Sequence, residues 1–289
     1  KKAEDLGDFL AQKQKEKLYS HYYLSFGSLS LQSPSSFELQ DNHSEKIFDL
    51  ASLTKALVTT PLVLKTLEDK SDSALLSLSF VDWVGEKGLL FHPQIQQMKI
   101  MDLLQHKAGL PPWVNLWINR CSSEGFFSPF NRSSLIRRLN DLVGGFRPLK
   151  GVFYSDIGFV LLGLGLELRF GRPLDQLFNK YCQKDLCFPR PPLSFASGLL
   201  EEKASIVPTS YCALRRRVLQ GEVHDENCAA LAGVSGHAGL FGSGENVVIF
   251  LRAFWCTKEA QRLLSWSQQG LFCGWRPGNT KTPSVFAQG

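Results

Sequence analysis

A serine and a lysine three residues apart, Ser52 and Lys55, form the pair in this sequence best suited to chemistry. On a helix, positions i and i+3 share one face, so the Ser52 Oγ and the Lys55 amine would lie side by side. A serine hydroxyl is a poor nucleophile until a base takes its proton, and a desolvated lysine can be that base. A simpler interpretation, an N-capping serine and a surface lysine, stays open because so short a motif often arises by chance.

A second polar pair, Tyr154 and Asp156, stands just ahead of an apolar stretch. A core tyrosine followed by an N-capping aspartate would explain that pair equally well by itself. Three further segments carry compact histidine-containing motifs: 103–111 around His106, 223–227 around His224, and 233–241 around His237 and Gly239. The functional prediction rests on all five segments and on their order along the chain.

Together the five segments resemble the penicillin-recognising serine hydrolases, which comprise class C-type β-lactamases, D,D-peptidases and β-lactamase-like esterases. Ser-Leu-Thr-Lys at 52–55 matches the first motif of that family, and Tyr-Ser-Asp at 154–156 resembles its Tyr-x-Asn motif. His-Lys-Ala-Gly-Leu at 106–110 is similar to a His-x-Ser-Gly-Leu segment of the family. The blocks at 223–227 and 236–241 look like those of the esterase branch.

The resemblance implies an acyl-enzyme mechanism without a metal ion or an organic cofactor. Ser52 would attack a carbonyl carbon, while Lys55 and Tyr154 would share the general-base and general-acid work. The Ser52 N–H would supply half of an oxyanion hole. The resemblance also implies four substrate-binding residues: His106, Asp156, His237 and Gly239.

The sequence departs from the family pattern at three places. Asp156 stands where the family often has Asn; a carboxylate only accepts hydrogen bonds, and its charge would hold Lys55 protonated and shift the base role toward Tyr154. Ala108 replaces a common serine. No Lys-Thr-Gly or His-Thr-Gly motif is present, since 281–283 reads Lys-Thr-Pro and proline lacks the N–H. We therefore expect either that a C-terminal strand is missing from this sequence or that the site is incomplete.

The predicted function is serine hydrolysis of an ester or amide, with a small ester or a β-lactam-like molecule as the substrate. Two alternatives stay open: a D,D-carboxypeptidase or endopeptidase acting on cell-wall peptides, and a non-catalytic penicillin-binding-like protein. An α/β-hydrolase is excluded because 233–237 has the wrong second glycine for Gly-x-Ser-x-Gly. The six histidines are dispersed, which predicts no metal site.

Length and composition describe a globular chain of ordinary type. The 289 residues fit one large domain or two interleaved ones. The net charge of +5 is scattered, and the cluster at 215–217 is typical of a solvated helix face, so we expect no nucleic-acid partner. The longest apolar run, 157–166, is shorter than the roughly 20 residues that span a bilayer. Seven cysteines without a CxxC motif favour a cytoplasmic location, and a bacterial periplasmic location stays open.

Two apolar helices must position the site. The segment 51–67 is apolar on every side, which predicts a buried helix with a kink or a new start at Pro61. The segment 156–170 predicts another, ended by Gly171 and Pro173. The remaining predicted elements are a helix over 4–18, a strand over 22–32, and helices over 98–106, 133–143 and 245–255.

The predicted fold is α/β (α+β), with strand-like segments near both ends of the chain and helices in the middle. The resemblance implies a β-lactamase/transpeptidase-like architecture: an antiparallel sheet flanked by helices, a mostly helical subdomain, and the site between them. We expect a sheet-containing region from 1–60 and 230–289 and a mostly helical region over 61–229. Together these regions would form one compact catalytic unit that acts on a small-molecule or peptide substrate.

Overall fold

A computed structural model of the chain describes residues 12–13, 15–16, 24–29, 34–40, 45–123, 125, 127–195, 205–271 and 273–274. The predicted helix over 4–18 lies almost entirely outside these residues. The Lys-Thr-Pro segment at 281–283 lies wholly outside them.

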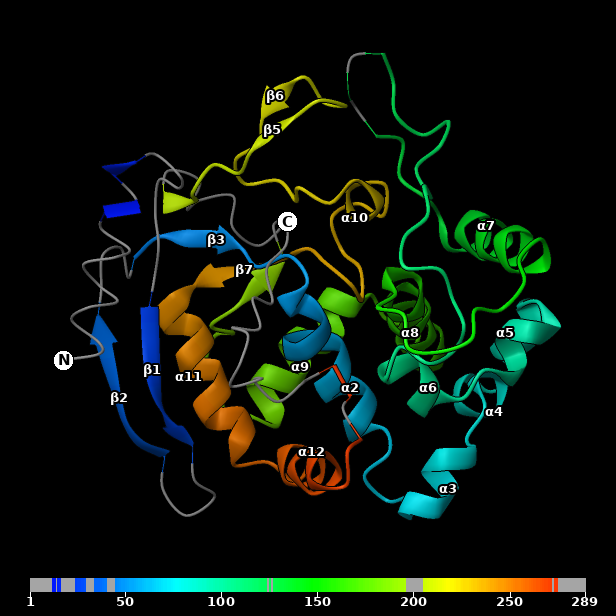
Figure 1. Ribbon diagram of the computed structural model, residues 1–289, viewed down its shortest axis with the longest axis horizontal. Coiled ribbons are helices and arrows are strands. Elements are labelled where there is room, and N and C mark those ends of the chain that lie inside the picture. The colour runs from blue at the N-terminus through cyan, green and yellow to red at the C-terminus, as the bar shows by residue number, and fades with distance from the viewer. Residues whose placement is uncertain are drawn as a thin grey trace.

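The sheet side of the molecule consists of short antiparallel strands (Figure 1). A three-stranded sheet has the order β3 (Ile47–Asp49), β7 (Leu240–Ser243) and β4 (Ser194–Phe195), and both of its pairs are antiparallel. The antiparallel pair β1 (Leu24–Leu29) and β2 (Pro34–Gln40) lies against the helix α11 (Gly244–Trp255) (Figure 1). An outlying pair is formed by β5 (Tyr211–Cys212) and β6 (Arg217–Val218). The arginine cluster at 215–217 belongs to this pair and its turn, and Arg215 is buried and donates to the Val223 carbonyl, so the expected solvated helix face is wrong. The strand predicted over 22–32 is confirmed by β1.

Helices form most of the regular secondary structure in the described residues. They are the π-helix η1 (Lys55–Thr59), α2 (Thr60–Lys65), α3 (Asp72–Ser77), α4 (Phe80–Val84), the 3-10 helix η2 (Glu86–Leu90), α5 (Pro93–Gln97), α6 (Ile100–Leu104), α7 (Arg132–Gly144), α8 (Asp156–Phe170), α9 (Leu174–Lys184), α10 (Glu226–Ala229), α11 (Gly244–Trp255) and α12 (Lys258–Gln268). The predicted helices over 98–106, 133–143, 156–170 and 245–255 are confirmed as α6, α7, α8 and α11.

The helix predicted over 51–67 is present, and its hydrogen bonding changes along its length. In η1 the Thr60 N–H donates to the Lys55 carbonyl, five residues back, and regular α-helix begins at Thr60. Pro61 falls in the first turn of α2, where its missing N–H costs little. The new start expected at Pro61 therefore takes the form of a change from π-helical to α-helical hydrogen bonding. Such π-helical turns often accompany functional sites.

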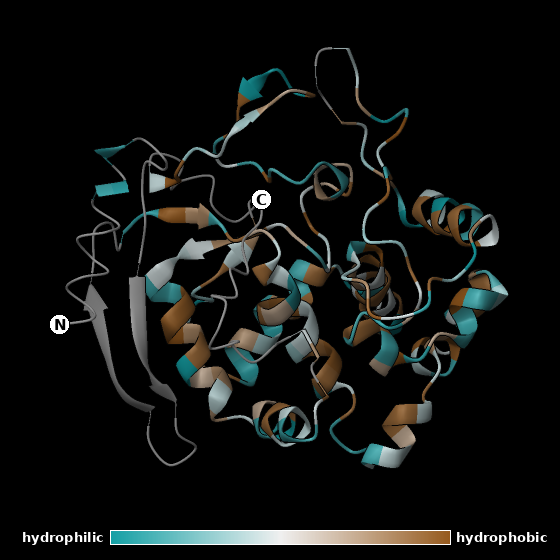
Figure 2. Cartoon of the chain, viewed as in Figure 1, coloured by the Kyte–Doolittle hydropathy of each residue, from teal (hydrophilic) through white to brown (hydrophobic). Residues whose placement is uncertain are grey.

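Helix α8 is buried on nearly all sides and forms the centre of the main hydrophobic core. The Ser155 Oγ caps its first turn by accepting from the Gly158 N–H, and Gly171 ends it in the left-handed conformation at φ 66°. The predicted end of this helix is therefore confirmed. Figure 2 shows hydrophobic residues concentrated on the helices at the centre of the view.

A smaller hydrophobic cluster lies under the three-stranded sheet. It joins Ile47 of β3 and Phe241 of β7 to residues of the long connection between β4 and β7, namely Ile206, Val223, Cys228 and Ala238. This cluster brings the histidine-containing blocks at 223–227 and 236–241 next to the strand that leads into Ser52. Strand β4 itself belongs to the segment 61–229 that we expect to be mostly helical.

Within the described residues, no helix is both long enough and apolar enough to span a membrane. The seven cysteines all lie in the described part of the chain and none forms a disulfide.

Candidate active site

Ser52 and Lys55 lie side by side at the end of the turn that follows β3. The Lys55 Nζ donates to the Ser52 Oγ at 2.8 Å, as the i, i+3 spacing predicts. Ser52 lies in the turn leading into η1, where the Lys55 N–H donates to the Ser52 carbonyl at 3.1 Å. Among the described residues the Ser52 N–H has no acceptor, so it remains available to a developing oxyanion.

The Lys55 side chain is enclosed by the protein, with 2% of its surface exposed. Three oxygen atoms surround its Nζ: the Ser52 Oγ, the Asp156 Oδ1 at 2.7 Å and the His237 carbonyl at 3.1 Å. The ring of Tyr154 lies 4.8 Å from the same nitrogen, measured to the ring centroid. The structure thus brings the predicted catalytic residues Ser52, Lys55 and Tyr154 together, with Asp156 and the backbone of His237 beside them.

The turn that carries Ser52 is held in an unusual conformation. Ala51 has φ 44°, a left-handed value that is uncommon for a residue other than glycine. The Asp49 carboxylate bridges this turn to a distant segment, because it accepts from the Ala51 N–H at 2.9 Å and from the His224 N–H at 2.8 Å. Burial raises the pKa of the Asp49 carboxyl, and the two backbone hydrogen bonds partly offset that effect. Asp49 therefore helps to fix the nucleophile turn.

His106 lies directly against Tyr154, with ring centroids 4.5 Å apart. Its Nδ1 accepts from the Ser155 N–H at 2.9 Å, and its carbonyl accepts from the Phe153 N–H at 3.0 Å. Like Ala51 it has a positive φ, at 59°. His106 is buried and supports the segment that presents Tyr154; its predicted contact with substrate stays a prediction.

The imidazole of His237 is buried, and both of its ring nitrogens have partners. Its Nε2 lies 2.8 Å from the Asp225 Oδ1 and its Nδ1 lies 2.8 Å from the Ser235 Oγ. Burial raises the pKa of Asp225, but the charge and hydrogen bond of His237 outweigh this and lower it to about 2. Asp225 is consequently an ionised carboxylate at neutral pH.

Gly239 lies where the loop containing His237 meets β7. Its φ of 108° suits glycine, and a Cβ at this position would lie 2.3 Å from the Gly233 carbonyl. Gly239 is therefore required by the backbone of the loop, and its predicted role in substrate binding stays a prediction.

Sequence reasoning did not identify Asp49 and Asp225 as part of the site. Both are adjacent to motifs that it did single out: Asp49 precedes Ser52 by three residues, and Asp225 is inside the block at 223–227. Their roles depend on contacts between segments about 175 residues apart in sequence, which spacing alone does not reveal.

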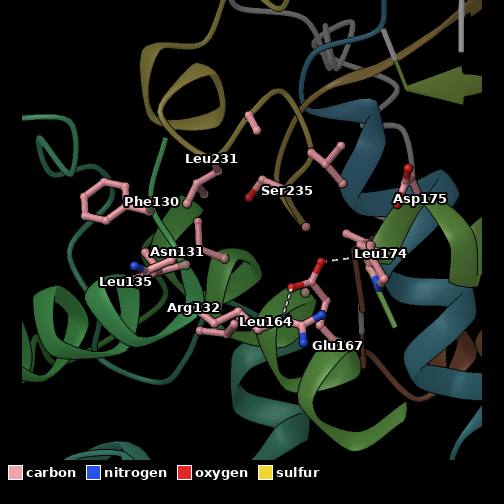
Figure 3. A pocket seen from close by; sticks show the side chains of 16 residues that line it. Phe130, Asn131, Arg132, Leu135, Leu164, Glu167, Leu174, Asp175, Leu231 and Ser235 are labelled. Atoms are coloured by element: carbon pink, nitrogen blue, oxygen red, sulfur yellow. Dashed lines mark hydrogen bonds and ion pairs between the residues drawn. The ribbon is translucent and has the colours of Figure 1, made fainter. Parts of the chain in front are cut away.

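A separate pocket of about 320 Å³ lies between the start of α7, one face of α8, the start of α9 and the loop before His237 (Figure 3). Glu167 lies in its wall, accepts from the Leu174 N–H at 2.9 Å and pairs with Arg132 at 3.4 Å. Burial raises the pKa of Glu167. Neither Ser52 nor Lys55 lines this pocket, so it is distinct from the candidate active site.

No group of three or more histidine, cysteine, aspartate or glutamate side chains is arranged to hold a metal ion in the part of the chain that the structure describes.

Comparison with known proteins gives one family and a set of distant relatives. A family model described as beta-lactamase matches residues 19–289. An N-acetylmuramyl-L-alanine amidase of Bacillus subtilis (strain 168) is 30% identical over 225 residues, which are 71% of this chain and 49% of the relative. A putative D-alanyl-D-alanine carboxypeptidase of Salmonella agona (strain SL483) is 26% identical over 219 residues, with coverage of 71% and 50%. The chain thus spans about half the length of the curated relatives it matches.

Solved structures show the same fold at low sequence identity. An octameric penicillin-binding protein homologue from Pyrococcus abyssi superposes with a TM-score of 0.60 at 16% identity, over 86% of this chain and 55% of that one. A class C beta lactamase superposes with a TM-score of 0.57 at 15% identity, over 86% and 64%. The predicted β-lactamase/transpeptidase-like fold is confirmed.

Proposed function

The chain belongs to the beta-lactamase family, and from this premise we propose that it is a serine hydrolase that cleaves an ester or amide through an acyl-enzyme on Ser52. The observation that carries the proposal is the buried Lys55 amine, 2.8 Å from the Ser52 hydroxyl and surrounded by two further oxygen acceptors. A surface lysine beside an N-capping serine would have no such enclosure. The arrangement supports activation of Ser52 by a fixed base.

The acceptors around Lys55 determine where its lone pair points. A neutral amine has two N–H bonds and one lone pair, and the Asp156 carboxylate and the His237 carbonyl can each take one N–H. The lone pair is then left for the Ser52 hydroxyl. As the Ser52 Oγ bonds to the substrate carbonyl carbon, its proton passes to Lys55, and the negative charge on the carbonyl oxygen faces the Ser52 N–H.

Tyr154 is the second proton-transfer group in the proposal. Its ring packs between His106 and Lys55 Nζ, and 43% of its surface is exposed, so it reaches the side on which substrate arrives. We assign it the transfer of the proton to the leaving group as the tetrahedral intermediate collapses. Water then attacks the acyl group, and the Ser52 Oγ regains a proton.

The entrance to the site favours apolar substrate groups. Three exposed apolar side chains flank Tyr154 and Asp156: Trp113, Val152 and Phe153. Trp113 is held there because the Asp156 N–H donates to the carbonyl of the residue before it, Pro112, at 3.0 Å. Such a rim suits a small ester or β-lactam-like molecule with an apolar substituent.

A second candidate function is cleavage of a cell-wall peptide. It is supported by the similarity to an N-acetylmuramyl-L-alanine amidase and to a putative D-alanyl-D-alanine carboxypeptidase. The chemistry on Ser52 would be the same, so the two candidates differ only in the substrate that reaches it.

Turnover of three substrate types tests the proposal: p-nitrophenyl butyrate, nitrocefin and a peptide ending in D-Ala-D-Ala. We expect the wild type to hydrolyse at least one, and Ser52→Ala to lose at least about 1,000-fold of that rate. Ser265→Ala, an exposed serine on α12, is the matched control and should keep full activity. Cleavage of the peptide alone would favour the second candidate, and equal rates for wild type and Ser52→Ala would refute the proposal.

A further inference from the structure

The carbonyl that faces Lys55 comes from an irregular loop. His237 lies in the segment 233–239, between α10 and β7, where Gly233 and Gly239 both have positive φ. A loop lacks the regular backbone hydrogen bonds that keep carbonyl groups in place in helices and sheets. The position of the His237 oxygen, 3.1 Å from the Lys55 Nζ, must therefore be set by side chains that hold this loop.

Asp225 and Ser235 hold the His237 ring from both ends. The ring is buried, with 1% of its surface exposed, and each nitrogen has a partner at 2.8 Å. The Nε2–H can donate to the Asp225 carboxylate, which only accepts, and Nδ1 pairs with the Ser235 hydroxyl, which can donate or accept. With both nitrogens bonded, the ring has no freedom to rotate without breaking a buried hydrogen bond.

The other end of this connection is anchored to a helix. The same Asp225 Oδ1 accepts from the Cys228 N–H at 2.7 Å and caps α10. Asp225 also feels the charge of Lys55, which contributes to its lowered pKa. A continuous path of short contacts thus runs from α10 through Asp225 and His237 to the amine of Lys55.

The loop is also pressed between two helices. The Thr59 Oγ1 of η1 donates to the Gly236 carbonyl at 2.7 Å, and a Cβ on Gly236 would lie 2.1 Å from the Phe159 carbonyl of α8. The backbone on either side of His237 therefore has little room to move. Once the His237 ring is released, the peptide plane between residues 237 and 238 can turn by small opposite rotations about the bonds on its two sides. The His237 carbonyl would then turn away from Lys55 without a large movement of the loop.

We propose that Asp225 and His237 are positioning residues, which keep the His237 carbonyl on Lys55 so that the amine faces Ser52. The proposal rests on the function proposed above. It gives the His237 side chain a role inside the protein, distinct from the contact with substrate that the sequence resemblance implies.

The test compares Asp225→Ala with Asp225→Asn by the rate at which a fluorophosphonate probe labels Ser52, measured over a range of probe concentrations. For Asp225→Ala we expect the maximal labelling rate to fall by about 10- to 100-fold, with the half-saturating concentration changed by less than about twofold. Asp225→Asn should restore the rate to within about threefold of wild type, since its amide oxygen can still accept from both N–H groups. Ser235→Ala, which leaves the α10 cap intact, should lower the rate by about threefold or more.

Thr257→Ala is the control for a general loss of stability. It removes the cap of α12, where the Thr257 Oγ1 accepts from the Ala260 N–H at 3.3 Å. It should destabilise the protein without slowing labelling. An Asp225→Ala protein that is folded and labels at the wild-type maximal rate would overturn the proposal, as would equal slowing in Thr257→Ala.

Crystal structures of the wild type and Asp225→Ala give a reading that does not depend on activity. We expect the wild type to keep the contact between the Lys55 Nζ and the His237 carbonyl and Asp225→Ala to lose it. A variant that keeps the contact would overturn the positioning role. If folded wild type is not labelled at all, the proposed function fails, and the two structures alone then decide whether Asp225 and His237 position the lysine.

Discussion

Lys55 and Asp156 form a nearly buried ion pair at the centre of the site, with 3% and 17% of their side chains exposed. Such a pair gains little stability, because removing two charges from water costs about as much as their attraction returns. Its value at this position is chemical. The carboxylate holds the Lys55 amine, which lies beside the Ser52 hydroxyl.

Asp156→Asn should keep the Lys55 amine in place, because an amide oxygen can accept from it as a carboxylate does. We expect the maximal labelling rate at pH 7 to stay within about threefold of wild type, whereas Asp156→Ala, which removes the acceptor, should lower it by about 10-fold or more. Probe labelling over a range of concentrations measures both rates. An Asp156→Asn rate as low as that of Asp156→Ala would show instead that the charge of Asp156 assists catalysis.

Tyr154→Phe should slow turnover strongly while leaving substrate binding almost unchanged. Loss of the hydroxyl removes the proton transfer to the leaving group, worth about 100- to 10,000-fold in kcat. The ring that packs between His106 and Lys55 is kept, so KM should stay within about threefold of wild type. Tyr211→Phe, an exposed tyrosine on β5, is the control. A kcat unchanged by Tyr154→Phe would remove Tyr154 from the mechanism.

At this scale the sequence predicts the catalytic residues better than those that support them. Ser52 and Lys55 are close because i and i+3 share a helix face. The motif at 154–156 can be recognised because Tyr154 and Asp156 stand two residues apart, just ahead of an apolar stretch. Asp49 and Asp225 gain their roles only when distant segments fold against the nucleophile turn and the lysine. No local pattern encodes that contact.

Close backbone contact between α8 and the loop before His237 is the main feature at the scale of elements. Gly236→Ala should destabilise the protein by about 1–3 kcal/mol, because the new Cβ would lie 2.1 Å from the Phe159 carbonyl and backbone must shift. It should also slow Ser52 labelling, since the loop carries the carbonyl that faces Lys55. Urea unfolding and probe labelling measure the two effects.

Gly144→Ala is the matched control for that substitution. Gly144 ends α7, and a Cβ there would lie 3.5 Å from its nearest neighbour, the His92 ring, which is an ordinary van der Waals contact. Alanine should leave stability unchanged or raise it by roughly 0.5–1 kcal/mol. Equal behaviour of the two alanine variants would contradict the close packing at Gly236.

Elements with strong local signals are those that the sequence predicts well. Helix α8 is found with both ends, because its apolar run begins sharply after a polar segment and Gly171 stops it in the left-handed conformation, although the capping residue is Ser155 and not Asp156. The short helices α3, α4 and α5 have five or six residues each, too few for a helical period to be recognised. Strand β4 has two residues and is defined only by its pairing with β7.

The stability of the whole molecule should depend on acid through Asp225. Its folded pKa of about 2 lies below the unfolded value of 3.8, so its charge stabilises the fold above about pH 4. That contribution, about 2 kcal/mol, is lost as the pH falls from about 4 to about 2. Asp225→Asn should therefore lower the free energy of unfolding at pH 7, and the gap to wild type should close over this range.

Urea denaturation of both proteins between pH 2 and pH 7 measures that gap. Asp141→Asn, an exposed carboxylate on α7, is the control and should change stability by less than about 0.5 kcal/mol throughout. A gap for Asp225→Asn that is the same at pH 2.5 and pH 7 would show that the ionised carboxylate is not what stabilises the fold.

The measurement closest to the central proposal is peptide mapping by mass spectrometry after treatment of the folded protein with a fluorophosphonate probe. We expect one adduct, on the peptide that contains Ser52, and none in Ser52→Ala under the same conditions. An adduct on another residue, or a folded wild type that stays unlabelled, would contradict the assignment of Ser52 as the nucleophile.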